Sequence, residues 1–309
     1  MDIRKYARWS RNVRFGGTLD DMAAHTNELA VHVRGLRKRY GDVAAVDGID
    51  LGIRRGEVFG LLGPNGAGKS TTVEILQGNR SRDAGDVSVL GSDPSTGTRA
   101  WRSRVGVVWQ DESAPAELTV RETVRHFARY YAKPRDPEEV IGLVGLEEKA
   151  GSRIKALSGG QRRRLDVALG VIGAPELLLL DEPTTGFDPG ARRRFWDLIR
   201  KLSDEGTTIL LTTHYLEEAE ALAHRLAVIA KGRVVAEGEP AALRDRYGTE
   251  ATVEWTEPDG TPRRERTGTP TRTITELMRR FDGEIPGLRV SRPTLEDVYL
   301  RLTGQEETR

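Results

Sequence analysis

The sequence predicts an α/β fold with a small α+β unit at its C-terminal end. Segments such as LLLL (177–180) and TILLT (208–212) are almost entirely apolar, which is typical of strands in a sheet covered on both faces. Segments with helical periodicity lie between these strands, as expected for a mainly parallel sheet. A glycine-rich segment, GLLGPNGAGKST (60–71), joins one such strand to one such helix.

The strands expected before residue 245 are short and rich in Val, Ile and Leu, residues that favour β structure. In chain order they are Val31–Gly35, Ile49–Ile53, Val58–Leu62, Val87–Leu90, Val105–Trp109, Leu177–Asp181, Thr208–Thr212 and Leu226–Ile229.

The helices expected in the same region have apolar residues at helical spacing. They are Lys69–Leu76, Val120–Tyr131, Gly160–Val171, Ala191–Leu202 and Leu216–Ala223. Residues from about 112 to 160 contain helical patterns without an apolar strand, so they form a predicted helical insertion.

The pattern changes again after Gly248. A strand (Ala251–Trp255), an EPDG turn and a basic strand (Pro262–Thr267) precede a helix near Ile274–Phe281. A strand near 288–291 and a final helix over 294–302 complete a small α+β domain. We therefore expect a flexible N-terminal extension (1–28), a main domain (29–245) and a C-terminal accessory domain (246–309).

Length and composition exclude several classes of protein. At 309 residues the chain has room for about two domains. Its net charge of +1 gives no basic field, so no nucleic-acid partner is expected. Cysteine is absent, which excludes disulfides and thiolate metal sites. No apolar run approaches the ~20 residues of a membrane span, and the N-terminal segment lacks the apolar region of a signal peptide, so a soluble protein is expected.

The glycine-rich segment matches the P-loop pattern, because Gly63 is followed after four residues by Gly68, Lys69 and Ser70. Its glycines allow backbone N–H groups to curl around phosphates. Lys69 is placed to reach the β- and γ-phosphates, and Ser70 to offer its hydroxyl to Mg²⁺. The predicted ATP-binding residues are Gly63, Pro64, Asn65, Gly66, Ala67, Gly68, Lys69, Ser70 and Thr71.

A second half of the site follows the apolar strand LLLLDEP (177–183). Asp181 ends this strand, where its carboxylate can hold Mg²⁺ directly or through water. Glu182 lies just beyond it and can polarise an attacking water as general base. Without the P-loop, the same pair would be an acidic helix cap.

Three further residues are candidates with ordinary alternatives. His214 follows the strand TILLTT and can donate a hydrogen bond to charge that develops on the γ-phosphate, although a lone His there also suits a cap. Gln110 ends the strand VGVVWQ, where its amide can meet Mg²⁺ or water, or simply lie in a loop. Tyr40 can stack on adenine or pack in a turn.

The stretch ALSGGQRRRLDVALG (156–170) predicts a helix that begins with a serine and two glycines. Ser158 is a good N-cap, and glycine eases the chain into the helix. Alternatively, the bare N–H groups and the helix dipole are presented to an anion. We interpret the three arginines that follow, Arg162–Arg164, as a solvated or acid-facing helix surface.

The order of these motifs resembles the nucleotide-binding subunit of an ABC transporter, over residues from about 29 to 238. The resemblance implies a P-loop (RecA-like) ATPase core with antiparallel β and α-helical subdomains. It also implies adenine stacking by Tyr40, catalytic roles for Lys69, Gln110, Glu182 and His214, and Mg²⁺ ligation by Ser70, Gln110 and Asp181. Phe187 departs from the family, in which leucine is usual beside the interface-loop residue Asp188.

The resemblance further implies a head-to-tail homodimer with ATP at its interface. Each subunit then caps its partner's nucleotide with the signature residues, which are Leu157, Ser158, Gly159, Gly160 and Gln161. The stretch RPTLEDVYLRLTG (292–304) resembles daunorubicin-resistance-type drug exporters. This branch implies a separate membrane permease and a peripheral location at the cytoplasmic face of the membrane. An importer ATPase and a non-transport ABC ATPase remain alternatives.

Overall fold

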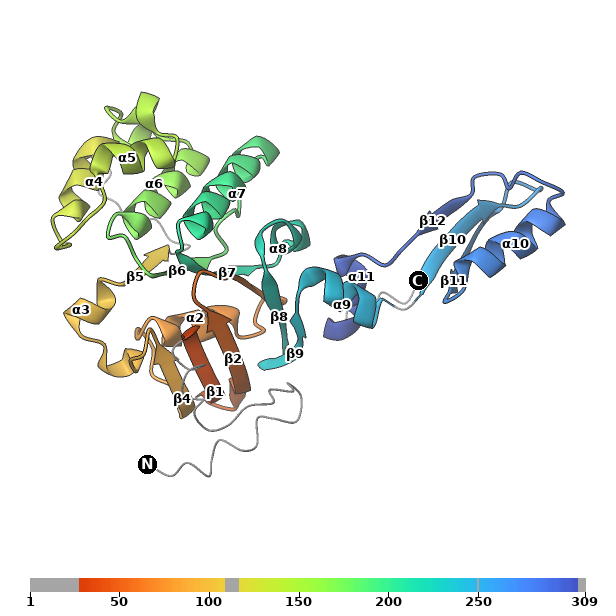
Figure 1. The fold of residues 1–309 in the computed structure, drawn as a ribbon, viewed down its shortest axis with the longest axis horizontal. Coiled ribbons are helices and arrows are strands. Elements are labelled where there is room, and N and C mark those ends of the chain that lie inside the picture. Colours follow the sequence, from red (N-terminus) through yellow and green to blue (C-terminus); the bar gives the residue numbers. More distant parts are fainter. Residues whose placement is uncertain (1–27, 109–116, 249, 305–309) are drawn as a thin grey trace.

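The computed structural model describes residues 28–108, 117–248 and 250–304. Its centre is a six-stranded sheet of order β5-β6-β7-β3-β8-β9 (Figure 1). All neighbouring strands are parallel except β8 and β9, which form an antiparallel edge. The strands are β3 (Val58–Leu62), β5 (Val105–Val108), β6 (Leu177–Asp181), β7 (Thr208–Thr213), β8 (Arg225–Ala230) and β9 (Arg233–Gly238).

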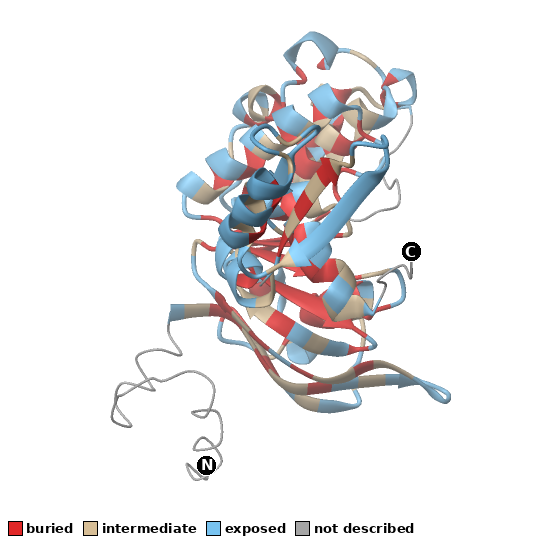
Figure 2. Ribbon diagram, turned by 90° about the vertical axis from the view of Figure 1, so that its right-hand side faces the viewer, coloured by how far each residue is buried: buried red, intermediate tan, exposed pale blue. Residues whose placement is uncertain are grey.

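The central strands are covered on both faces, as the sequence predicts. In β6, Leu178 and Leu180 belong to a core that includes the helices of the helical region. Leu177 and Leu179 face a second core, shared with the antiparallel sheet described next. Figure 2 shows the buried residues gathered on the strands and the inner helix faces.

The second sheet is antiparallel and has the order β2-β1-β4. It consists of β1 (Leu29–Tyr40), β2 (Val43–Arg54) and β4 (Ala84–Val89). The helix α2 (Lys69–Leu76) contributes Val73, Ile75 and Leu76 to the core between the two sheets. The P-loop therefore emerges from β3 at a packed junction of both sheets.

The helical region lies above β5 and β6 in Figure 1. Its helices are α4 (Val120–Ala128), α5 (Pro137–Leu143) and α6 (Gly159–Val171), with 3-10 turns at Glu147–Lys149 and Ile154–Ala156. α7 (Pro189–Asp204) and α8 (Leu216–Leu222) follow β6 and β7. A short helix α3 (Arg99–Arg102) and the 3-10 turn Pro94–Thr96 precede β5.

The C-terminal residues form a second three-stranded sheet of order β11-β10-β12, which extends away from the rest of the molecule (Figure 1). One face packs on helix α10 through Val253, Trp255 and Leu277. The last helix, α11, instead returns to the main body, where Leu295 and Tyr299 pack in a core with Leu62 of β3. The elements are α9 (Pro240–Tyr247), β10 (Ala251–Thr256), β11 (Pro262–Thr267), α10 (Pro270–Arg280), β12 (Arg289–Ser291) and α11 (Leu295–Thr303).

The predicted α/β class is confirmed, together with the antiparallel and helical regions. The α-helices and strands that the sequence analysis does not predict, α3, α5, β9 and α9, are short and have at most three consecutive apolar residues. Helix α4 ends at Ala128, before the predicted Tyr131. Residues 1–27 of the expected extension, and Trp109 and Gln110, lie outside the described residues. Among the described residues, no helix is both long and apolar enough to cross a membrane.

Candidate nucleotide-binding site

The P-loop connects β3 to α2 and leaves no room for side chains at two of its glycines. A Cβ on Gly63 would lie 2.4 Å from the carbonyl oxygen of Ile229. Gly68 has a φ of 104°, and a Cβ there would lie 2.3 Å from the carbonyl oxygen of Ala45. Neighbouring backbone therefore requires glycine at both positions, and the left-handed conformation requires it at Gly68 as well.

Lys69 begins α2, and its side chain turns back into the loop. It is only 4% exposed, and Nζ donates to the carbonyl oxygens of Gly63 at 2.8 Å and Pro64 at 3.2 Å. Asn65 and Gly66, at the tip of the loop, are exposed. A buried ammonium group thus lies directly beneath backbone that is open to a ligand.

Asp181, at the end of β6, is buried beside two hydroxyl groups. Thr212 of β7 donates to Oδ1 of Asp181, and Oγ of Ser70 lies 3.4 Å from the same oxygen. Hydroxyl and carboxylate oxygens are the ligands that Mg²⁺ prefers, usually with phosphate and water completing its shell. Within the described residues, no group of three or more His, Cys, Asp or Glu side chains could hold a metal alone. The donor set fits a Mg²⁺ ion shared with phosphates.

Glu182 has a left-handed backbone conformation, with a φ of 45°. For a non-glycine residue this conformation costs roughly 1–2 kcal/mol, so the surroundings must hold it. Its N–H donates to Thr212, at 3.2 Å to the carbonyl oxygen and 3.0 Å to the hydroxyl. Its carboxylate lies between two cationic or polar groups, with Oε1 3.5 Å from Nζ of Lys69 and Oε2 3.3 Å from Nδ1 of His214.

His214 follows β7, and its ring lies against that of Tyr215, with centroids 4.1 Å apart. Its buried Nδ1 makes no hydrogen bond within the described part of the chain, despite its proximity to Glu182. The residues Lys69, Ser70, Asp181, Glu182 and His214 thus converge from three neighbouring parallel strands.

The signature residues begin α6, and Ser158 forms a reciprocal capping box with Gln161. The Ser158 hydroxyl accepts from the N–H of Gln161, whose side-chain oxygen accepts from the N–H of Ser158. The N-cap interpretation is therefore correct. No atom lies within 4 Å of a Cβ built on Gly159, and Ser158 and Gly159 are exposed. The first turn of α6 is open to an approaching group.

The expected arginine surface on α6 is solvated or acid-facing, and the solvated form is wrong for Arg163, whose Nη1 lies 4.0 Å from Oδ2 of Asp166. Arg163 is only 9% exposed and donates to the carbonyl oxygens of Asp181 and Pro183. Arg164 donates to the carbonyl oxygens of Val144 and Gly145 in the helical region. Burial lowers the pKa of Arg163, partly offset by the carboxylates of Asp166, Asp181 and Glu218. These arginines hold the helix to its neighbours.

Tyr40 and Asp188 lie at the edges of this arrangement. The Tyr40 ring is 41% exposed, with the guanidinium carbon of Arg80 5.3 Å from its centroid. Asp188 caps α7 and accepts from the N–H of Ala191 at 2.8 Å, a contact that lowers its pKa. Phe187 is buried and packs edge-on against Phe195.

Two contributors to the site escape the sequence reasoning. Thr212 forms hydrogen bonds with both Asp181 and Glu182. Threonine is common in strands, so its place in the apolar strand 208–213 does not mark it as a site residue. Arg163 is one of three consecutive arginines, which the sequence suggests are exposed. The only sign of its burial is that it lies four residues before Val167, on the apolar face of α6. Gln110 belongs to the undescribed residues, so its predicted role stays a prediction.

Residues 46–185 match the ABC transporter family. Nod factor export ATP-binding protein I of Ralstonia nicotianae is 42% identical over 301 residues, covering 89% of this chain and 94% of that protein. This chain belongs to the ABC transporter family. As an ABC transporter ATP-binding subunit it binds and hydrolyses ATP.

Solved structures of ABC cassettes share the fold. The cassette cbiO1 of Clostridium perfringens, part of the cbiONQ transporter complex, is 28% identical with a TM-score of 0.64 and covers 70% of this chain and 90% of its own. A bacterial ABC transporter cassette solved as a dimer is 25% identical with a TM-score of 0.60, covering 68% of this chain and 98% of that one.

Proposed function

We propose that this ABC ATPase powers export through a separate membrane permease, at the cytoplasmic face of the membrane. The observation that carries the proposal is the likeness to a Nod factor export ATP-binding protein over almost its full length. The family stretch at 292–304 supports a finer assignment, export of a drug or other natural product. The helical region, near α4, is the proposed docking surface for the permease.

The proposed hydrolytic roles follow from the geometry of the site. Glu182 acts as general base on water, and His214 donates to charge that develops on the γ-phosphate. Lys69 and the P-loop N–H groups hold the β- and γ-phosphates. Ser70, Asp181 and Gln110 hold Mg²⁺, which neutralises phosphate charge when bound. Tyr40 stacks on adenine.

We further propose that two copies of the chain pack head to tail. The open first turn of α6 supports this, since Ser158 and Gly159 are exposed and a Cβ on Gly159 would meet no atom within 4 Å. A related cassette has been solved as a dimer. Backbone N–H groups and the helix dipole then bind the partner's γ-phosphate. Asp188 lies in the proposed interface loop.

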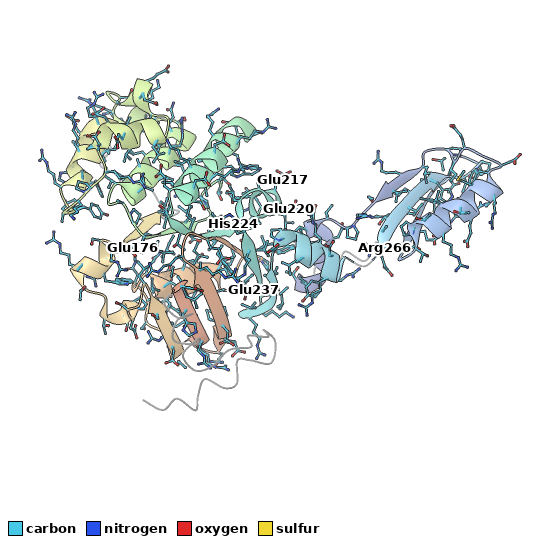
Figure 3. All side chains as sticks on the ribbon, in the orientation of Figure 1. Glu176, Glu217, Glu220, His224, Glu237 and Arg266 are labelled. Atoms are coloured by element: carbon cyan, nitrogen blue, oxygen red, sulfur yellow. The ribbon has the colours of Figure 1, made fainter. Side chains whose placement is uncertain are left out.

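The proposed domain division is an extension (1–28), an ATP-binding domain (29–245) and an accessory domain (246–309). Packing of α11 on β3 and α9 gives the accessory domain a firm attachment to the main body. Its β11 strand is exposed and basic, and Arg266 lies on the sheet that extends away from the main body (Figure 3). A role in dimer assembly or coupling is proposed for it.

The test is a pull-down from detergent-solubilised native membranes with the Glu182→Gln variant held in Mg-ATP. Mass spectrometry should recover a multi-span membrane protein in stoichiometric amount. Recovery of ribosomal or other non-membrane partners alone would contradict transport and leave the ATPase chemistry intact. A permease found with a periplasmic or surface binding protein would instead indicate import.

A further inference from the structure

Arg163 is buried on the helix that presents the signature residues, and it reaches the other half of the site. Its Nη2 donates to the carbonyl oxygen of Asp181 at 2.8 Å. Its Nε donates to the carbonyl oxygen of Pro183 at 3.1 Å. One guanidinium therefore bridges the carbonyl groups on either side of Glu182.

These bonds act on backbone in an unfavourable conformation. Glu182 is left-handed, with a φ of 45°, and such a residue persists only where its surroundings fix it. β7 fixes its N–H, which donates to Thr212. α6 fixes the flanking carbonyls through Arg163. Two separate elements thus determine where the Glu182 carboxylate points.

We propose that Arg163 is a positioning residue for ATP hydrolysis, which holds segment 181–183 so that the Glu182 carboxylate stays between Lys69 and His214. The proposal rests on the proposed role of Glu182 as general base. A guanidinium suits the task because its donors form a rigid planar fork and its charge persists when buried. The same side chain joins the hydrolytic carboxylate to the helix that begins with Ser158, so a displacement of α6 displaces Glu182.

A purely structural role is the alternative, because a buried arginine that binds two carbonyls also stabilises the fold. The two roles differ in what they change. Loss of positioning lowers kcat and spares ATP binding, since the bonds from Arg163 to the carbonyls of Asp181 and Pro183 hold the segment around the base and not the P-loop. Loss of folded protein lowers the melting temperature and the fraction of chains that bind ATP.

The test compares Arg163→Met, which keeps the length and loses every donor, with Arg163→Lys, which keeps charge and one donor group. Arg164→Met is the matched control, because Arg164 lies on the same helix and donates to the carbonyls of Val144 and Gly145 instead. We expect Arg163→Met to lower kcat about tenfold or more, as for charge-assisted hydrogen bonds, with the Kd for ATP changed less than about twofold. Arg163→Lys should fall between, and Arg164→Met should match the native chain.

A double-mutant cycle with Glu182→Gln separates this proposal from the role of Glu182 itself. If Arg163 acts through Glu182, Arg163→Met will not lower the residual rate of Glu182→Gln any further. Native kcat in both Arg163 variants, or an equal loss of kcat and ATP-binding stoichiometry, would overturn the proposal. Native turnover in Glu182→Gln would instead overturn the general-base role. If Arg163→Met does not fold, the Arg163→Lys variant carries the same comparison.

Discussion

The ammonium group of Lys69 and the carboxylate of Glu182 lie 3.5 Å apart inside the site. One residue starts the helix after the P-loop, and the other follows β6 two strands away in the sheet. The pair is almost wholly shielded from solvent, so its attraction is weakly screened. In the proposed mechanism the γ-phosphate competes with Glu182 for this lysine, and that competition would link nucleotide binding to the position of the proposed base.

Replacing Glu182 with Gln removes the proposed base and the competing charge. We expect phosphate release to fall by ~100-fold or more, as for loss of a general base. ATP binding should be equal to or tighter than that of the native chain, because one carboxylate near the phosphates is lost. Phosphate release and equilibrium ATP binding measure the two effects. The control is Glu217→Gln, on the exposed side of α8 (Figure 3). Unchanged turnover in Glu182→Gln would disprove the general-base role of Glu182.

Replacing Lys69 with Ala removes the buried cation beneath the P-loop. ATP binding should weaken about 10- to 100-fold, the effect of losing a hydrogen bond to a charged group. Calorimetric titration with ATP measures it. Lys201→Ala, at the exposed end of α7, should bind ATP like the native chain. Native affinity in Lys69→Ala would show that Lys69 does not contact phosphate.

Two glycines should respond differently to the same change. Gly68→Ala places a Cβ 2.3 Å from the carbonyl oxygen of Ala45, in a left-handed conformation. It should lower the free energy of unfolding by roughly 1–3 kcal/mol, as for backbone strain. Gly159→Ala meets no atom within 4 Å, so its stability should change little.

Gly159→Ala should nevertheless lower ATP turnover, because a side chain there obstructs the partner's γ-phosphate. Thermal unfolding, single-chain ATP binding and turnover separate the two variants. A stable Gly159→Ala with native turnover would exclude close approach of a ligand to this turn.

Glu218 makes the stability depend on pH. The side chain is fully buried, and burial raises its pKa, opposed in part by the nearby polar groups of Thr213, Thr184 and Trp196 and by the charge of Arg192. Neither carboxylate oxygen has a hydrogen bond within the described residues. The unfolded chain ionises this group near its ordinary pKa of 4.5, whereas the folded chain holds the proton to higher pH. Glu218 therefore destabilises the fold increasingly as the pH rises through that window.

Comparison with Glu218→Gln isolates the effect. The free energy of unfolding of the native chain, relative to the variant, should decrease from pH 4.5 upward and level off above the raised pKa. Denaturant titrations across that range measure the difference. A difference that does not vary with pH would show that Glu218 ionises normally in the fold.

The sequence is informative where chemistry and packing use the same residues. The P-loop and the end of β6 are recognisable because glycines, a lysine and paired acids follow apolar strands at fixed spacing. Helix α7 starts at Pro189, two residues before the predicted start. The sequence carries the signal for this start, because Asp188 is a good N-cap and proline suits the first helical position. Apolar spacing alone places the start at Ala191, because it takes no account of the cap at Asp188.

Other features depend on tertiary contacts that sequence patterns do not reveal. Arg163 lies between two other arginines, Arg162 and Arg164, and is the one of the three that is buried. The approach of α6 to the end of β6 buries it, and the run of arginines does not reveal this. The edge strand β9 (Arg233–Gly238) has only three consecutive apolar residues, and one residue of the strand, Ala236, is buried. The left-handed Glu182 is flanked by bonds to distant parts of the chain, from its own N–H to Thr212 and from Arg163 to the carbonyls of Asp181 and Pro183.

The most direct test of an ATP site shared between two copies of the chain uses the Glu182→Gln variant. Analytical ultracentrifugation gives its mass with and without Mg-ATP, and the amount of bound nucleotide per chain is measured in the same samples. We expect a monomer without ATP and, with Mg-ATP, a dimer that holds one ATP per chain. The dimer should be lost in the double variant Glu182→Gln/Gly159→Ala. A chain that binds ATP stoichiometrically and stays monomeric would contradict a site shared between two copies.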